Sequence, residues 1–92
     1  MRETAIEGHL RDGAKKIGGK AYKFISPGNN GVPDRLVCLP GGRIAFVETK
    51  APGRTSTDLQ KLQQERLRKM GFVVTVLDSK TKVDEFLSEM QK

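Results

Sequence analysis

Residues 34–50, which read DRLVCLPGGRIAFVETK, decide the fold: two apolar stretches are separated by a Pro-Gly-Gly triplet. Residues 34–39 and 43–49 are rich in apolar and β-branched side chains, and each stretch predicts a strand. Residues 40–42 have the turn chemistry of a tight hairpin, so the two strands are expected to pair antiparallel. A three-residue loop puts Leu39 opposite Arg43, and the remaining pairs follow by counting.

The same count places Asp34 opposite Glu48, and side-chain alternation brings Lys50 to that face of the sheet. Like charges on facing positions destabilise a hairpin unless something compensates them. A divalent cation is the natural compensation, because Mg²⁺ and Mn²⁺ prefer oxygen ligands, and Lys50 beside it would steady negative charge developing on a phosphate. A one-residue slip would move Asp34 to the other face. The alternative interpretation is a surface salt bridge between Glu48 and Lys50, with Asp34 capping a strand.

The whole chain predicts the element order α-β-β-β-α-β-α. Expected helices cover residues 3–17, 58–70 and 82–90, and expected strands cover residues 20–25, 34–39, 43–49 and 72–77, the last of them buried. The strand–helix–strand order implies an α/β fold with a mixed sheet flanked by helices. A chain of 92 residues is expected to form a single domain, 1–92.

The charge balance indicates a polyanionic partner. Seventeen Lys and Arg against eleven Asp and Glu give a net charge of +6 and a pI near 9.8, which is typical of nucleic-acid binding. By charge alone, a soluble protein that is merely basic fits equally well. Basic residues that would line a DNA path are Lys20, Lys23, Arg35 and Arg54. Ser26, Asn29 and Asn30 belong to a glycine-rich loop that either contacts phosphate or is an ordinary flexible loop.

The sequence disfavours a membrane-bound or secreted location for the protein. Apolar stretches are short, so no membrane partner is expected, and the first residues lack the apolar core of a signal peptide. The single Cys38 makes neither an internal disulfide nor a multi-cysteine zinc site. We therefore expect a reducing, cytoplasmic location.

Three motifs carry a family resemblance. Residues 31–35 (GVPDR), 47–53 (VETKAPG) and 57–60 (TDLQ), the last followed by Gly71, occur in that order along nearly the whole chain. Together they resemble the VRR-NUC branch of the PD-(D/E)xK nucleases. The resemblance implies a restriction-endonuclease-like core, phosphodiester hydrolysis with Mg²⁺ or Mn²⁺, and relatedness to Holliday junction resolvases.

By the resemblance, Asp34, Glu48 and the backbone carbonyl of Thr49 would hold the metal, Lys50 would be the catalytic lysine, and Gln60 would lie close to the scissile phosphate. The family also has an acid on the first helix. Glu7 fits better than Glu3, since it lies on the apolar stripe and further from a terminus that frays. Position 49 holds Thr where a bulky aliphatic residue is commoner. Its side chain is expected on the opposite face, where it would alter packing more than chemistry.

The expected function is therefore a metal-dependent, structure-specific DNA endonuclease that resolves branched DNA such as four-way (Holliday) junctions. Paired cuts need two active sites, so a C₂ homodimer is expected. The alternatives are a monomeric nickase or flap nuclease with the same site, and a non-catalytic DNA-binding module of the same fold. No recognition helix or zinc finger is evident, which favours recognition of shape and backbone.

Overall fold

The computed structural model describes residues 1–92, and the predicted element order is confirmed. The elements are α1 (Glu3–Lys16), β1 (Lys20–Lys23), β2 (Arg35–Leu39), β3 (Arg43–Thr49), α2 (Asp58–Lys69), β4 (Val73–Leu77) and α3 (Lys80–Met90). Helix α3 begins two residues before its predicted start, because the Ser79 side chain accepts a hydrogen bond from the Lys82 N–H and caps the helix there. None of the three helices is long and apolar enough to cross a membrane.

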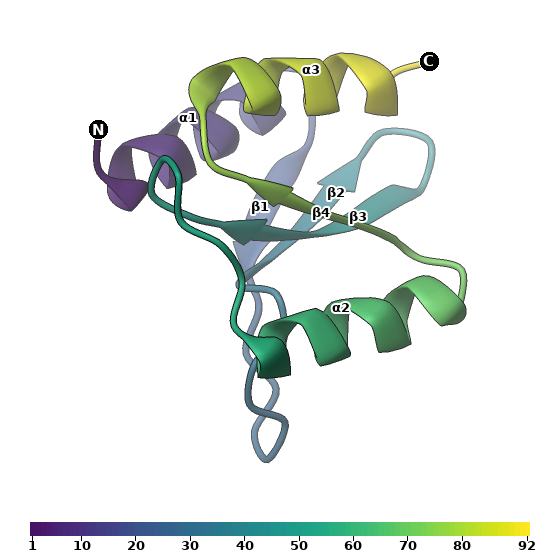
Figure 1. The fold of residues 1–92 in the computed structure, drawn as a ribbon. Coiled ribbons are helices and arrows are strands. Elements are labelled where there is room, and N and C mark those ends of the chain that lie inside the picture. The colour runs from purple at the N-terminus through teal and green to yellow at the C-terminus, as the bar shows by residue number, and fades with distance from the viewer.

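The four strands form one mixed sheet in the order β1-β2-β3-β4 (Figure 1). Strands β1, β2 and β3 are antiparallel neighbours, whereas β4 pairs parallel with β3. Leu39 pairs with Arg43 and Leu36 with Phe46, so the hairpin register counted from the Pro-Gly-Gly turn is confirmed. The last pair of this ladder is Arg35 with Val47, which leaves Asp34 one residue outside the strand.

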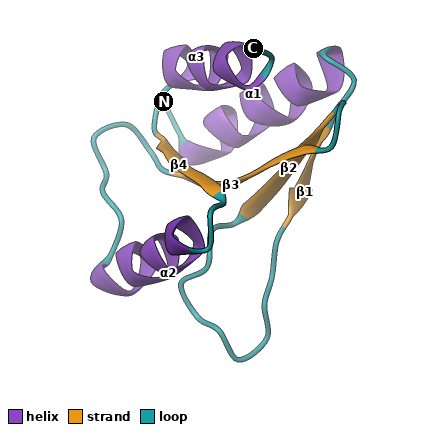
Figure 2. Ribbon diagram, turned by 90° about the vertical axis from the view of Figure 1, so that its right-hand side faces the viewer, coloured by secondary structure: helices purple, strands orange, loops and turns teal.

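Helices cover the sheet unequally. Figures 1 and 2 show α1 and α3 together on one face and α2 alone on the other. The core lies between the sheet and the helix pair, and its twelve buried residues are Ile6, Leu10, Ala14, Ala21, Val37, Leu39, Ala45, Val47, Leu77, Val83, Phe86 and Leu87. On the α2 face, the rings of Phe24, Phe46 and Phe72 meet edge to face, at centroid distances of 5.4 and 5.5 Å.

Strand β4 is an edge strand, which corrects one prediction. The segment 72–77 was expected to be buried, but Val73 is 47% exposed and Phe72 is 39% exposed. Val74 and Leu77 are buried, so only part of the strand faces the interior. An apolar run does not distinguish a central strand from an edge strand, because both have one face against a core.

Helix α2 is fixed at its start by a capping box. The Thr57 side chain accepts from the Gln60 N–H, and the Gln60 side chain accepts from the Thr57 N–H. The loop between β1 and β2 docks on this end of the helix: a side chain at Gly31 (φ +86°) would place its Cβ 2.8 Å from Leu59. Only glycine suits both the backbone conformation and the close approach there.

Candidate active site

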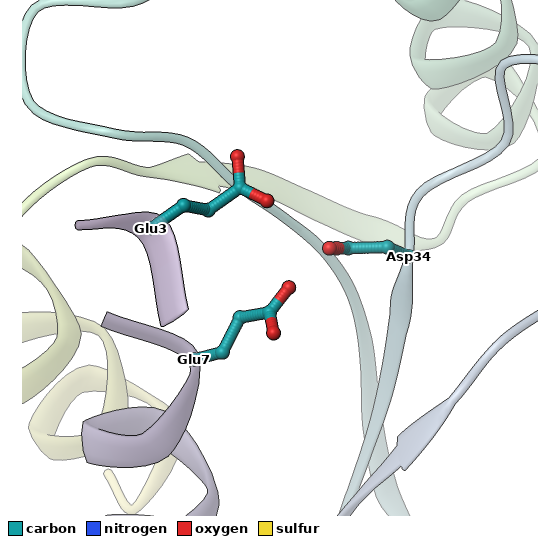
Figure 3. Close-up of side chains that lie close together, drawn as sticks. All are labelled: Glu3, Glu7 and Asp34. Atoms are coloured by element: carbon teal, nitrogen blue, oxygen red, sulfur yellow. The ribbon is translucent and has the colours of Figure 1, made fainter. Parts of the chain in front are cut away.

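Three carboxylates converge at one end of the sheet. Glu3 and Glu7 lie one turn apart on α1, and their side chains point toward Asp34, the residue before β2 (Figure 3). One carboxylate oxygen from each of the three lies within 4.8 Å of the others. The burial of Ile6 and Leu10 against the sheet sets the rotation of α1 that brings both acids to this place.

Asp34 is held by Thr49 at the end of the central strand β3. Its Oδ1 accepts from the Thr49 N–H at 3.2 Å, and its Oδ2 accepts from the Thr49 hydroxyl at 2.9 Å. Burial raises the pKa of Asp34 above its usual range, these hydrogen bonds oppose the shift, and Glu7 adds to it. The site therefore holds Asp34 in place while disfavouring its negative charge.

Glu48 is the most buried acid of the site, with 5% of its surface exposed. Burial is the main cause that raises its pKa from 4.5 to about 7, the charge of Asp34 raises it further, and Lys50 partly offsets both. Glu48 is not one of the three acids that cluster within 4.8 Å. The charge of Asp34 nevertheless raises the pKa of Glu48, so the two carboxylates repel each other. The predicted facing of Asp34 and Glu48 lies beyond the last pair of the ladder, and the Asp34 carboxylate bonds to Thr49 instead.

Thr49 differs from expectation. Its side chain was expected to affect packing on the far face, yet its hydroxyl lies 3.1 Å from Glu7 Oε1 as well as 2.9 Å from Asp34 Oδ2. Side-chain alternation does turn Thr49 to the sheet face opposite that of Glu48. Helix α1 packs on the face of Thr49 and brings Glu7 to it. A hydroxyl has one proton and can donate to only one carboxylate at a time. The oxygen that does not receive this proton faces a lone pair of the hydroxyl, so the contact favours a proton or a cation beside it.

Lys50 and Gln60 meet beside the acids. Lys50 Nζ donates to Gln60 Oε1 at 2.8 Å, and the same oxygen accepts from the Thr57 N–H at 2.8 Å. The capping box therefore holds the amide that positions the ammonium group, and the amide NH₂ of Gln60 remains able to donate. A polar pocket of about 580 Å³ opens here, lined by Met1, Glu3, Lys50, Ala51, Pro52, Arg54, Thr55 and Thr57.

Arg35 is placed differently from the role expected for it on a DNA path. Its side chain is only 17% exposed, it lies 3.6 Å from a Glu7 oxygen, and it donates to the Ala21 carbonyl at 3.4 Å. The guanidinium therefore lies against Glu7 of the acidic cluster rather than facing solvent. The sequence pattern missed this contact, because only the packing of α1 on the sheet brings Glu7 to β2.

The other expected DNA contacts do not touch the acids. Lys23 and Arg54 are exposed, and Arg54 lines the pocket of Lys50. Asn29 donates to the Ser26 hydroxyl at 2.8 Å, and the Asn30 carbonyl accepts from Gln63 at 3.0 Å. These bonds make residues 26–30 a structured turn tied to α2, and their role in DNA binding stays a prediction.

The structure therefore joins acids from α1, from the residue before β2 and from β3 to a lysine that follows the last acid by two residues. A mixed sheet with this acid-x-lysine ending on its central strand defines a PD-(D/E)xK-type domain. No protein-family model matches the chain. The chain is 57% identical over 79 residues to "Putative nuclease p44" of Acyrthosiphon pisum secondary endosymbiont phage 1, across 86% of this chain and 85% of that protein.

A solved structure described as a VRR_NUC domain aligns with a TM-score of 0.87 and 33% identity over 94% of each chain. This likeness confirms the restriction-endonuclease-like fold that the sequence motifs predict. The chain belongs to the VRR-NUC family of nucleases.

Proposed function

We propose that this protein is a divalent-metal-dependent endonuclease that hydrolyses phosphodiester bonds in DNA. The observation that carries the proposal is the meeting of Glu3, Glu7 and Asp34 within 4.8 Å, beside a Lys50 that Gln60 holds in place. Two further points support it: the similar phage protein bears the name of a nuclease, and the chain shares the VRR-NUC fold.

The donor set fits a hard cation. The acids supply only oxygen ligands, and Mg²⁺ and Mn²⁺ are bound through such ligands. Burial is the main cause that raises the pKa values of Asp34 and Glu48, and neighbouring carboxylates add to it, so a bound cation would favour the ionised form of both acids. Asp34, Glu48 and the Thr49 carbonyl would hold the ion, with Glu7 beside them. When bound, the ion supplies Lewis-acid stabilisation of the phosphate and lowers the pKa of water.

The protein's own groups then have separate tasks. Lys50 directs its ammonium toward the phosphate and stabilises the charge that develops on its oxygens. Gln60 positions Lys50 and offers its amide N–H groups to the phosphate or to the attacking water. Arg35 and Thr49 keep Glu7 and Asp34 in a fixed arrangement. Water attacks the phosphorus in line with the bond to the 3′-oxygen, and the cleavage leaves a 5′-phosphate and a 3′-hydroxyl.

We propose branched DNA, such as four-way junctions, as the substrate, cut by a homodimer in a reducing compartment such as the cytoplasm. The net charge of +6 supports phosphate contact. The sheet face that carries α2 supports self-association, because its apolar side chains are incompletely covered. Tyr22 and Ile44 on the sheet, and Leu59 and Leu62 on α2, are 37–48% exposed. A second copy of the same face would bury them and supply the second active site.

The test is a panel of linear, flap, splayed and four-way DNAs incubated with Mg²⁺, Mn²⁺ or EDTA. We expect metal-dependent, paired symmetric cuts in the four-way substrate and a dimer by light scattering. Cuts confined to flaps by a monomer would replace the substrate proposal with a flap nuclease or nickase. Binding without cleavage of any substrate would replace it with a non-catalytic DNA-binding module.

A matched variant tests the site itself. Asp34→Asn keeps the size of the side chain but removes the charge, so it should abolish cleavage while DNA binding persists. Asp12→Asn, on the exposed side of α1, is the control and should cut like the parent protein. If Asp34→Asn also cuts at the parent rate, the assigned site is wrong.

A further inference from the structure

A second pocket, basic in character, lies behind the wall of the Lys50 pocket. It has a volume of about 300 Å³ and is lined by Arg54, Thr55, Ser56, Lys61, Gln64, Val76, Asp78 and Lys82. Three of these side chains are cations and one is a carboxylate. None of its lining residues belongs to the acidic cluster, so its charge is opposite to that of the proposed metal site.

The single carboxylate does not neutralise the pocket. Asp78 accepts from Lys82 Nζ at 2.9 Å and from the Gly53 N–H at 3.4 Å, and both bonds hold the pKa of Asp78 below its usual range. Arg54 and Lys61 have no carboxylate within 4.0 Å. Two cations therefore remain available to an anion, while Asp78 ties the turn that carries Arg54 to the start of α3.

A hydroxyl donor is fixed in the same pocket. The side chain of Gln64 is 3% exposed and donates to Ser56 Oγ at 2.9 Å. This bond uses a lone pair of Ser56 and leaves its O–H free to donate. A buried amide thus orients a hydroxyl beside two unpaired cations, which is the combination of donors that protein sites present to phosphate.

The two pockets share a wall. Arg54 and Thr55 line both the Lys50 pocket and the basic pocket. If the scissile phosphate lies at Lys50, a DNA strand that crosses this wall would bring another of its phosphates to Lys61. We propose that the basic pocket is a subsite for a backbone phosphate of the cleaved strand, with Lys61 as its main contact; this rests on the proposed nuclease function.

Salt-dependent binding tests the subsite directly. Lys61→Ala is compared with Lys69→Ala, which also removes an exposed lysine, but from the other end of α2. Both are made in a Lys50→Ala background, and four-way DNA is titrated with Ca²⁺ present. Loss of one phosphate contact lowers the slope of log K against log salt by about 0.9. We expect that loss, and about 3- to 10-fold weaker binding at moderate salt, for Lys61→Ala only.

A chemical scan then separates a strand phosphate from general attraction. Each phosphate near the cut is replaced in turn by a neutral methylphosphonate. At one position on one side of the scissile bond, the methylphosphonate should weaken DNA binding by the protein that retains Lys61. The same substitution should have no further effect on Lys61→Ala, since that variant already lacks the contact. Equal behaviour of Lys61→Ala and Lys69→Ala, or no position that depends on Lys61, overturns the subsite.

The two proposals fail separately. If the protein with Lys50 intact cuts no DNA but Lys61→Ala still loses one phosphate contact, the nuclease function is wrong and the phosphate site remains. If it cuts DNA and Lys61→Ala behaves like Lys69→Ala, only the subsite is wrong. In cleavage assays the subsite predicts a raised KM with an almost unchanged kcat for Lys61→Ala, since the contact binds substrate without touching the reacting atoms.

Discussion

Replacing Glu48 with Gln should make the metal-free protein more stable and inactive at once. Glu48 is 5% exposed, and its pKa is raised from 4.5 to about 7, chiefly by burial and then by the charge of Asp34. A buried carboxyl with a raised pKa lowers the stability of the folded protein when it ionises. Its burial is therefore explained by cation binding and not by a contribution to stability.

The magnitude follows from the pKa shift. At about 1.4 kcal/mol per pKa unit, ionised Glu48 costs the folded state roughly 3 to 4 kcal/mol. Below pH 4.5 the carboxyl is protonated in both states and costs nothing. Between pH 4.5 and 7 the unfolded state loses its proton first, so stability falls as pH rises, and above pH 7 the cost is complete. Because a buried amide also needs hydrogen bonds, we expect Glu48→Gln to gain about 2 kcal/mol at pH 8.

Thermal unfolding followed by circular dichroism in EDTA measures this gain. For a domain of this size, about 2 kcal/mol raises Tm by on the order of 10 °C. The gain should shrink at pH 5, and Mn²⁺ should stabilise the parent protein more than the variant. Glu85→Gln, on the exposed side of α3, is the control and should change little. A variant no more stable than the parent at pH 8, or a gain as large at pH 5, would refute the reasoning.

Three other predictions follow from the geometry. Lys50→Ala should lower kcat by about 10²- to 10⁴-fold in single-turnover cleavage, yet keep the metal-induced rise in Tm, because it removes a cation and not a ligand. Gly31→Ala should cost at least about 1 kcal/mol more than Gly28→Ala in urea unfolding, since both have positive φ but only the first meets α2. Glu7→Gln should lose more cleavage activity than Glu3→Gln, and equal rates in the two variants would contradict the ranking.

The central hairpin was predictable because its register depends on a local feature of the sequence. The Pro-Gly-Gly turn sets the loop length, and the strand pairs follow by counting outward from it. The observed strand pairs, from Leu39 with Arg43 to Leu36 with Phe46, are those predicted by counting from the turn. The start of α2 was also predictable from local sequence. Thr57 and Gln60 lie three residues apart, which is the spacing of a capping box.

The contacts between distant segments were not predictable from pattern. Whether the strand at 73–77 is central or at the edge depends on how many strands pair beyond it, which its own residues do not encode. The contacts of Arg35 and Thr49 with Glu7 depend on where α1 crosses the sheet. The sequence therefore predicts a DNA contact for Arg35 and a packing position for Thr49, since no local signal shows that α1 lies against them.

The choice between Glu3 and Glu7 shows how sequence spacing and structure complement each other. Residues four apart share one helix face, so the spacing alone places both near whatever that face meets. Both do reach Asp34. What separates them is their partners, because Glu7 is held by Thr49 at 3.1 Å and by Arg35 at 3.6 Å, whereas no hydrogen bond or ion pair holds Glu3. A fixed carboxylate loses less freedom when it binds an ion. Glu7 is therefore the acid on α1 that the fold prepares for the metal, and Glu3 is the one that is free to move.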